Sequence, residues 1–434
     1  MRYLTSGTAP VRLALCAALV WLGLGGAAVA QVTFNVEGRG QGSVRINLNL
    51  DDSNGGNRGE LISLARFVQR DLHSSGFFSI AVLPPGTRST QSNWQSTEVA
   101  AYTTRLSSTT SGPSGRIVSV ELNDAGTPKT LLRRQFQVSE NDAPLIGHTI
   151  SDILYQYFVG REGYFATKIA YVRQVRNGNR RQFEIVSSYV DGSDLQVLTT
   201  SSAELASPRL SADGNTLVYV RISNERPQLF FSDFNSGRNG AVFRDRELRF
   251  GPDIGPDGTI FYTKVINGNA DIYRARIGSG AETRLTFAPS IETASSVSPD
   301  GSRMAYITDG TGALRIVVQD LAGGSSRTIG ASGYYGSPSW SPDGTMLAFT
   351  KQGGGTFSIG VVSLDTLEER LLSTSYFEEH PVWAKNGRVL LFERSGRSGE
   401  SGGGSSLWQV DLDSAGLYRL PLETPASDPV WFAK

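Results

Sequence analysis

The sequence predicts an α+β N-terminal domain followed by an all-β six-bladed β-propeller that is closed by the C-terminal strand. Three observations support this fold class. The second half of the chain repeats every 43–44 residues, which is the period of propeller blades. The first repeat lacks one strand, and the last residues of the chain supply it. Residues 31–165 do not follow this repeat, and some of their apolar residues are spaced as on one face of a helix.

The first 30 residues have the pattern of a cleaved secretory signal peptide. Arg2 and Arg12 form a charged region, residues 13–24 are apolar, and Ala28-Val29-Ala30 is a small-residue cleavage site. The apolar run is shorter than the roughly 20 residues of a membrane span, although an uncleaved anchor is the alternative. We therefore expect an exported protein that does not span the membrane.

The composition excludes several classes of function. Cys16 is the one cysteine and lies in the predicted signal, so the mature chain would form neither disulfides nor thiolate metal sites. Without Arg2 and Arg12, the 41 basic residues become 39 against 41 acidic residues. This slightly negative balance argues against a nucleic-acid partner.

Residues 31–165 predict a small α+β domain. Leu61, Leu64, Val68 and Leu72 share one face of a predicted helix. We expect helices at 59–74 and 143–158 and strands at 31–36, 43–50, 77–83, 115–122 and 130–138.

The repeats of residues 166–434 are marked by turns of the type Ser341-Pro342-Asp343-Gly344. One strand (A) precedes each turn and three (B, C and D) follow it. Proline fixes φ, and glycine accepts a left-handed conformation. One carboxylate per turn cannot enclose a cation that needs six or more oxygens, so we interpret the turns as structural. The closing glycines are Gly214, Gly258, Gly301, Gly344 and Gly387.

The ends of the repeat region predict how the ring closes. Residues 168–200 contain B, C and D strands without an A strand, and residues 428–432 resemble an A strand without a B strand. We expect the C-terminal strand to complete the first blade, which leaves no free sheet edge.

Motifs for catalysis and metal binding are weak. His73, His148 and His380 are widely separated and are expected to be core or surface histidines. The G-x-S-x-G match at 399–403 lies in a Gly/Ser-rich insertion rather than between a strand and a helix. The run that starts at residue 51 has no glutamate at the twelfth position of a calcium loop, and residues 51–60 are interpreted as a capped strand-to-helix loop. We expect a binding protein with no cofactor and no metal, rather than an enzyme.

The chain resembles the TolB family, the periplasmic propeller proteins of the Tol–Pal system. The resemblance rests on the junction HTISDILYQYFVGREGYFATKIAYV (148–172), the helix and turn GELISLARFVQRDLHSSGFFSI (59–80) and the ending DPVWFAK. It covers essentially the whole mature chain.

The resemblance implies a non-enzymatic adaptor that supports outer-membrane integrity and envelope constriction in cell division. Its propeller would bind the peptidoglycan-associated lipoprotein Pal, and other envelope proteins or bacteriocins are further candidate partners. Its extreme N-terminal strand would bind TolA, with the Gly-rich residues 38–42 as a hinge. A fixed strand of the first domain is the alternative. The predicted TolA-binding residues are Gln31, Val32, Thr33, Phe34, Asn35, Val36 and Glu37.

The D-to-A connections cluster at one mouth of the predicted ring and vary between blades, as a recognition surface does. Aromatic and arginine residues there are candidate anchors, and the acidic ones would meet a basic partner patch. The predicted Pal-binding residues are Glu204, Arg249, Phe250, Glu292, Thr293, Tyr334, Tyr335, Glu378, Glu379 and His380.

Two other functions compete with the adaptor. A propeller-gated peptidase would need a further hydrolase domain with Ser, Asp and His, and the sequence after the closing strand ends at Lys434. A propeller enzyme or lectin that acts on envelope glycans or peptides would need acids converging on the channel, which the sequence leaves open.

Overall fold

The structure is a computed structural model. It describes residues 44–52, 57–83, 102–111, 115–127, 129–139, 142–178, 180–323, 325–330, 332–396, 404–423 and 425–432. All of these residues belong to one compact unit. The predicted signal peptide, the segment from Gln31 to Glu37 and the G-x-S-x-G match lie outside the described residues.

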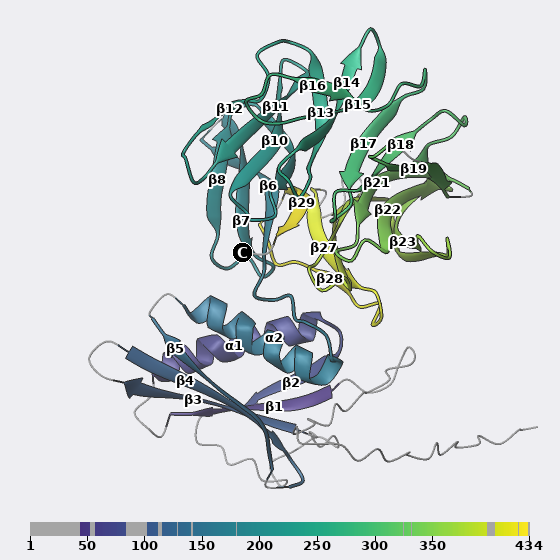
Figure 1. Cartoon of the computed structure of the whole chain (residues 1–434). Helices are drawn as coiled ribbons and strands as arrows, with labels where there is room; N and C mark the ends of the chain where they lie inside the picture. The colour runs from purple at the N-terminus through teal and green to yellow at the C-terminus, as the bar shows by residue number, and fades with distance from the viewer. Residues whose placement is uncertain are drawn as a thin grey trace, which may run out of the picture. The chain divides into compact units, whose positions relative to one another are not determined.

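The N-terminal part is a five-stranded sheet with two helices on one face (Figure 1). The strand order is β2-β1-β3-β4-β5, in which β1 runs parallel to β2 and β3 and the remaining pairs are antiparallel. The elements are β1 (Val44–Asp51), α1 (Arg58–Ser74), β2 (Phe78–Leu83), β3 (Tyr102–Ser111), β4 (Gly115–Asp124), β5 (Thr130–Val138) and α2 (Ala143–Val159).

Local sequence explains where these elements begin. The Asn57 side chain accepts hydrogen bonds from the backbone N–H groups of Gly59 and Glu60, which confirms that this loop caps α1. The sequence analysis missed β3 because its serines and threonines look like loop residues. Leu106 and Ser108 of β3 are nevertheless buried beneath the helices, and Ser108 donates to Glu60.

The junction after α2 is held by one buried carboxylate. α2 ends at Gly160, whose φ of 74° is left-handed. Asp152 accepts hydrogen bonds from the backbone N–H groups of Phe165 (2.8 Å) and Ala166 (3.1 Å). Burial raises the pKa of Asp152 to about 7. Gly163 packs so closely that a Cβ would lie 2.1 Å from the Asp152 carboxylate, so a larger residue does not fit.

The propeller consists of six four-stranded antiparallel sheets (Figure 1). Blade 1 is β29 (Ala426–Phe432), β6 (Lys168–Asn177), β7 (Arg180–Tyr189) and β8 (Gln196–Ser201). Blade 2 is β9 (Glu204–Leu210), β10 (Thr216–Ser223), β11 (Arg226–Asp233) and β12 (Asn239–Ala241). Blade 3 is β13 (Leu248–Ile254), β14 (Ile260–Ile266), β15 (Asn269–Ala275) and β16 (Glu282–Arg284).

The same A-B-C-D order continues through the other three blades. Blade 4 is β17 (Glu292–Val297), β18 (Arg303–Thr308), β19 (Arg315–Asp320) and β20 (Ser326–Ile329). Blade 5 is β21 (Tyr334–Trp340), β22 (Met346–Gly353), β23 (Thr356–Ser363) and β24 (Glu369–Ser375). Blade 6 is β25 (Phe377–Trp383), β26 (Val389–Ser395), β27 (Ser406–Asp411) and β28 (Leu417–Arg419).

The ring closes as the sequence predicts. β29 pairs antiparallel with β6, and Trp431 lies opposite Ile169. The A strands contact one another in sequence around the ring, from β9 to β29 and back to β9. A separate cluster of buried apolar side chains fills each of the six interfaces between neighbouring blades. The predicted fold class is therefore confirmed.

The repeated turns are structural. Gly344 has φ of 70°, and its N–H donates to the Ser341 carbonyl at 2.9 Å. Asp343 accepts from the Ser341 hydroxyl and from the Thr345 backbone N–H, so its carboxylate is used inside its own turn. All five closing glycines have φ between 65° and 78°.

The helical layer contacts the propeller through hydrogen bonds. Gln409 Nε2 of blade 6 donates to the Ser74 carbonyl at 3.1 Å. The buried His148 ring lies 2.7 Å from Asp71 Oδ2 and 3.3 Å from Ser193 Oγ of blade 1. His148 is thus a core histidine, as the sequence analysis expects. None of the helices in the described part of the chain combines the length and apolarity needed to span a bilayer.

Candidate partner-binding surface at one mouth of the propeller

The blade topology defines two rims. In an antiparallel A-B-C-D sheet, the A–B and C–D turns lie at one end of the strands, and the B–C hairpins lie at the other end with the D–A connections. We call the second group of loops the D–A rim. The D–A rim is the mouth that the sequence analysis selects for partner binding.

Each innermost strand carries a β-bulge at the same place. The register shifts by one residue in every pairing of an A strand with its B strand. One residue of each bulge has positive φ. Five of these six residues are not glycine, so their backbone conformation is strained. These six bulge residues, with φ of 48–58°, are Ser207, Gly251, Ala294, Ser337, His380 and Asp428.

The bulges bring together charged groups from blades 1 and 6. His380 Nδ1 lies 3.6 Å from Glu393, which also accepts from the Asp428 backbone N–H. One side-chain atom from each of the three lies within 4.8 Å of the others, a spacing suited to a metal ion. Burial alone would lower the pKa of His380, but Glu393 and Asp428 raise it to about 9. The two carboxylates favour the protonated imidazole, so we interpret the three side chains as an ion-pair network.

Four of the ten predicted Pal-binding residues have buried side chains. Arg249, Glu292, Tyr335 and Glu378 are at most 2% exposed. Each stands two residues before a bulge residue, where the side chain points between blades. These four side chains therefore belong to the framework beneath the D–A rim rather than to its exposed surface.

Arg249 shows what such a framework residue does. Its Nε lies 2.8 Å from Glu282 Oε1, and its Nη2 lies 3.0 Å from Asp245 Oδ2. Glu282 also accepts from Lys264 at 2.7 Å and from the Tyr262 hydroxyl at 2.6 Å. The guanidinium thus ties the connection that precedes blade 3 to the outermost strand of that blade.

Equivalent positions in other blades hold similar networks. The Tyr335 hydroxyl donates to Glu369 at 2.7 Å. Glu378 accepts from Arg394 Nε at 2.8 Å and from the Ser373 hydroxyl at 2.7 Å. Polar side chains with partners in the fold therefore fill a position that is apolar in blade 2, where Leu205 occupies it.

The other six predicted residues reach solvent to different degrees. Glu204 and Tyr334 are exposed, and Tyr334 has 52% of its surface accessible. Phe250, Thr293, Glu379 and His380 are half-buried beside the bulges. Whether any of them binds a partner stays a prediction.

Besides Tyr334, which the sequence analysis selects, the structure reveals exposed apolar residues that the sequence analysis missed. Phe287 is 71% exposed, and Tyr376 and Tyr334 are each about half exposed. Exposed aromatic side chains at one rim are typical of protein-binding surfaces. The set lies on the hairpins and connections of blades 3–5 and is named here the apolar crescent. It comprises Ile266, Phe287, Ile291, Leu314, Tyr334 and Tyr376.

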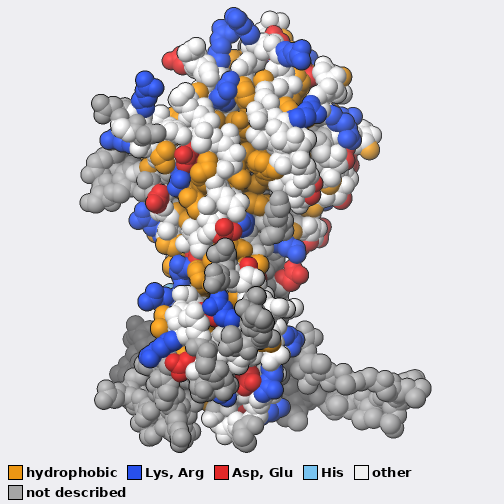
Figure 2. Space-filling view, turned by 90° about the vertical axis from the view of Figure 1, so that its left-hand side faces the viewer, with side chains coloured by type: hydrophobic (Ala, Val, Ile, Leu, Met, Phe, Trp, Pro, Cys, Tyr) orange, Lys and Arg blue, Asp and Glu red, His pale blue; other side chains and the backbone are white. Residues whose placement is uncertain are grey.

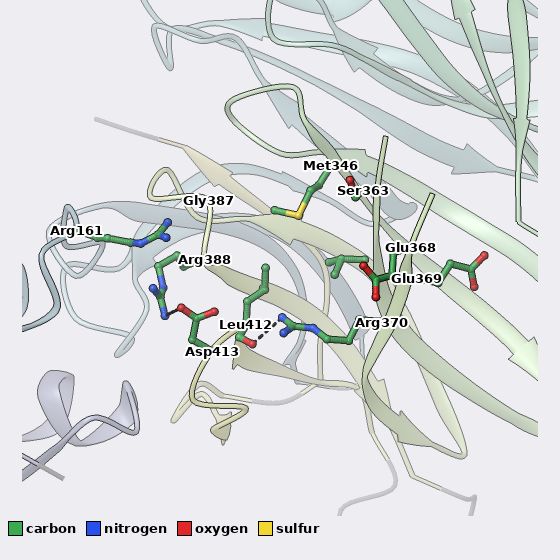
Figure 3. Close-up of a pocket in the computed structure, with 11 residues that line it drawn as sticks. Arg161, Met346, Ser363, Glu368, Glu369, Arg370, Gly387, Arg388, Leu412 and Asp413 are labelled. Atoms are coloured by element: carbon green, nitrogen blue, oxygen red, sulfur yellow. Dashed lines mark hydrogen bonds and ion pairs between the residues drawn. The ribbon is translucent and has the colours of Figure 1, made fainter. Parts of the chain in front are cut away.

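A pocket of about 490 Å³ lies between blades 5 and 6 on the opposite rim (Figure 3). Most of its charged side chains have partners within the fold. Arg388 pairs with Asp413 and Asp411, and Arg370 donates to the Leu412 carbonyl at 2.6 Å. Ser363 is the one hydroxyl in its lining, and the described lining residues contain no histidine to act as its base.

Fold and rim together define the class of protein: a six-bladed β-propeller that follows an α+β domain and carries an exposed apolar crescent at one mouth. Comparisons with known proteins narrow this class to one family. Residues 155–434 match the TolB beta propeller domain (PD40). The chain therefore belongs to the TolB family.

Individual relatives agree with this assignment. The chain is 37% identical to the Tol-Pal system protein TolB of Dinoroseobacter shibae over 244 residues, which cover 53% of this chain and 54% of the relative. It is 30% identical over 181 residues to the Tol-Pal system protein TolB of Legionella pneumophila strain Corby, covering 41% and 43%. In these matches the chain spans about half the length of its curated relatives, or less.

A solved structure shows the same fold. The crystal structure of TolB from Acinetobacter baumannii matches with a TM-score of 0.77 at 22% identity, covering 91% of this chain and 98% of that one. At this identity the match establishes the fold alone.

Proposed function

We propose that this chain is a periplasmic, non-enzymatic adaptor of a Tol–Pal system. Its D–A rim binds the peptidoglycan-associated lipoprotein, and its N-terminal segment from Gln31 to Glu37 binds TolA. Through these contacts it supports outer-membrane integrity and envelope constriction during division. The proposal is supported by membership of the TolB family and by relatives named Tol-Pal system protein TolB.

The apolar crescent is the observation that supports the lipoprotein site. Phe287, Tyr334 and Tyr376 lie on one rim with half or more of their surface accessible, although most residues of their size are buried in this fold. Covering them with a partner would bury large aromatic surfaces, which dominate interface energies.

Calorimetric titration with the soluble domain of the lipoprotein tests this site. Replacing Phe287 and Tyr376 by alanine should weaken binding at least about tenfold, because aromatic anchors at interfaces contribute about 1–2 kcal/mol or more each. The matched control replaces Leu195 and Val197, which are similarly exposed on the outer part of blade 1. If the wild type does not bind the lipoprotein, or if both double variants bind equally, the assignment is wrong.

The N-terminal segment has its own test. Deleting residues 31–42 should abolish binding to TolA and leave the melting temperature and lipoprotein binding unchanged. A lower melting temperature would instead support a fixed strand of the first domain.

A further inference from the structure

Six arginines with no carboxylate partner gather on one sector of the D–A rim. Within the described part of this rim, their guanidinium groups form no ion pair, and all six residues are exposed. They lie on the B–C hairpins of blades 1 and 2 and on the connection from blade 2 to blade 3. We name Arg176, Arg180, Arg181, Arg226, Arg244 and Arg246 the arginine sector. Figure 2 shows Lys and Arg side chains scattered over the upper part of the propeller.

Unpaired guanidinium groups are not a general property of this rim. Arg173 is bound by Glu184 at 2.9 Å, and Arg249 and Arg394 are bound within the networks described above. Arg221 lies over the Phe230 ring at 3.7 Å. The fold thus engages these four arginines and leaves the sector available.

The sector has an excess of positive charge. Its exposed carboxylates are Glu204, Glu225 and Glu247, while Asp245 is occupied by Arg249. Six guanidinium groups against three free carboxylates leave three positive charges. The sequence analysis expected acidic rim residues to meet a basic partner, but two of those acids, Glu292 and Glu378, are buried.

The arginine sector is continuous with the apolar crescent. β13 pairs with β14 so that Leu248 lies opposite Val265. Arg246 lies two residues before Leu248, and Ile266 of the apolar crescent directly follows Val265. A partner that covers the crescent thus also reaches the arginines.

We propose that the protein partner of the D–A rim presents an acidic surface to the arginine sector, and that this charge pair steers the partner onto the apolar crescent. This inference rests on the proposed function and specifies the chemistry of its partner. Arginine presents a planar fork of donors that matches a carboxylate in two parallel hydrogen bonds, and the sector uses no lysine.

The interleaved acids favour a protein partner over an anionic lipid surface. Glu225 directly precedes Arg226, and Glu247 directly follows Arg246. A phosphate-bearing bilayer would repel these carboxylates, whereas a protein surface of mixed charge uses them to fix its register.

Stopped-flow association with the soluble domain of the peptidoglycan-associated lipoprotein tests the proposal. The test variant combines Arg176→Gln, Arg180→Gln and Arg226→Gln. At low salt its association rate constant should fall about tenfold, while its dissociation rate constant stays within about twofold. Between about 20 mM and 500 mM NaCl the wild-type rate should fall steeply and the variant rate only weakly, because salt screens exposed charges.

A control variant removes the same net charge elsewhere. It combines Arg58→Gln and Arg66→Gln on α1 with Arg238→Gln on a C–D turn, all three of which are exposed. This control should associate like the wild type. Equal rates for the test and control variants, or a wild-type rate that does not respond to salt, would overturn the proposal.

Vesicles rich in phosphatidylglycerol distinguish the lipid alternative. Sedimentation of the wild type but not of the test variant with these vesicles, together with unchanged lipoprotein association, would assign the sector to lipid and refute the protein partner. A wild type that does not bind the lipoprotein at any salt concentration would contradict the proposed function itself, and this inference would fall with it.

Discussion

Replacing Arg249 by alanine should lower the free energy of unfolding by about 3 kcal/mol and leave partner affinity almost unchanged. The guanidinium is 2% exposed and bridges Asp245 and Glu282. Removing one member of a buried ion pair costs about 3–5 kcal/mol. The lower end applies because Glu282 keeps Lys264 and Tyr262, and because half of the Asp245 side chain is accessible to water.

Urea unfolding followed by tryptophan fluorescence measures this change, and calorimetric titration of the folded variant with the lipoprotein measures affinity. Tyr334→Ala is the matched control, because Tyr334 is 52% exposed at the same rim. It should change stability by less than about 0.5 kcal/mol and weaken binding. If Arg249→Ala unfolds like the wild type but loses affinity, Arg249 contacts the partner and our assignment of it to the framework is wrong.

Three further predictions concern the ring. Deleting residues 426–434 removes β29 from β6 and should lower the melting temperature severely in a calorimetric scan; a truncated chain that melts like the wild type would refute closure by this strand. The pKa of His380 is raised to about 9 in the folded protein, above its unfolded value of about 6.5. Protonated His380 therefore stabilises the fold fully below pH 6.5, and this stabilisation is lost as pH rises through 9. Urea unfolding at several pH values should therefore show a fall of up to about 2 kcal/mol that His380→Gln abolishes, and equal falls in both proteins would contradict the ion-pair network. Gly344→Ala should cost about 1 kcal/mol of unfolding free energy, because the backbone there has φ of 70°. There is room for the added Cβ, whose nearest atom is 3.7 Å away, so the cost comes from the backbone. Gly353→Ala is the control, because Gly353 has open space and no positive φ; it should cost less, and both variants should bind the lipoprotein like the wild type.

Most of the fold was predictable because its determinants are local and repeated. The turn ending at Gly344 encodes its own geometry through Ser341 and Asp343, and its spacing counts the blades. β3 was missed because its serines and threonines carry little hydrophobic signal, although Leu106 is buried.

The sequence selects a candidate rim but does not show which of its side chains are exposed. Period-two alternation assigns the faces of a strand only while the strand stays regular, and every A strand contains a bulge. The Pro that follows a bulge residue, as in Ser337-Pro338 and His380-Pro381, was an available signal for this irregularity. The sequence analysis therefore selects both Tyr334 and Tyr335 as binding residues, although only Tyr334 is exposed.

The sequence alone determined the architecture, the number of blades, the closing strand and the mouth that varies between blades, because each depends on spacing along the chain. Only the tertiary structure decided which side chains at that mouth are free. Arg249 is held between carboxylates of its own blade and the preceding connection, whereas Arg176 and Arg226 have no such partner among the described residues. Exposure and pairing depend on neighbours that are distant in sequence, and these neighbours become adjacent only when the ring closes.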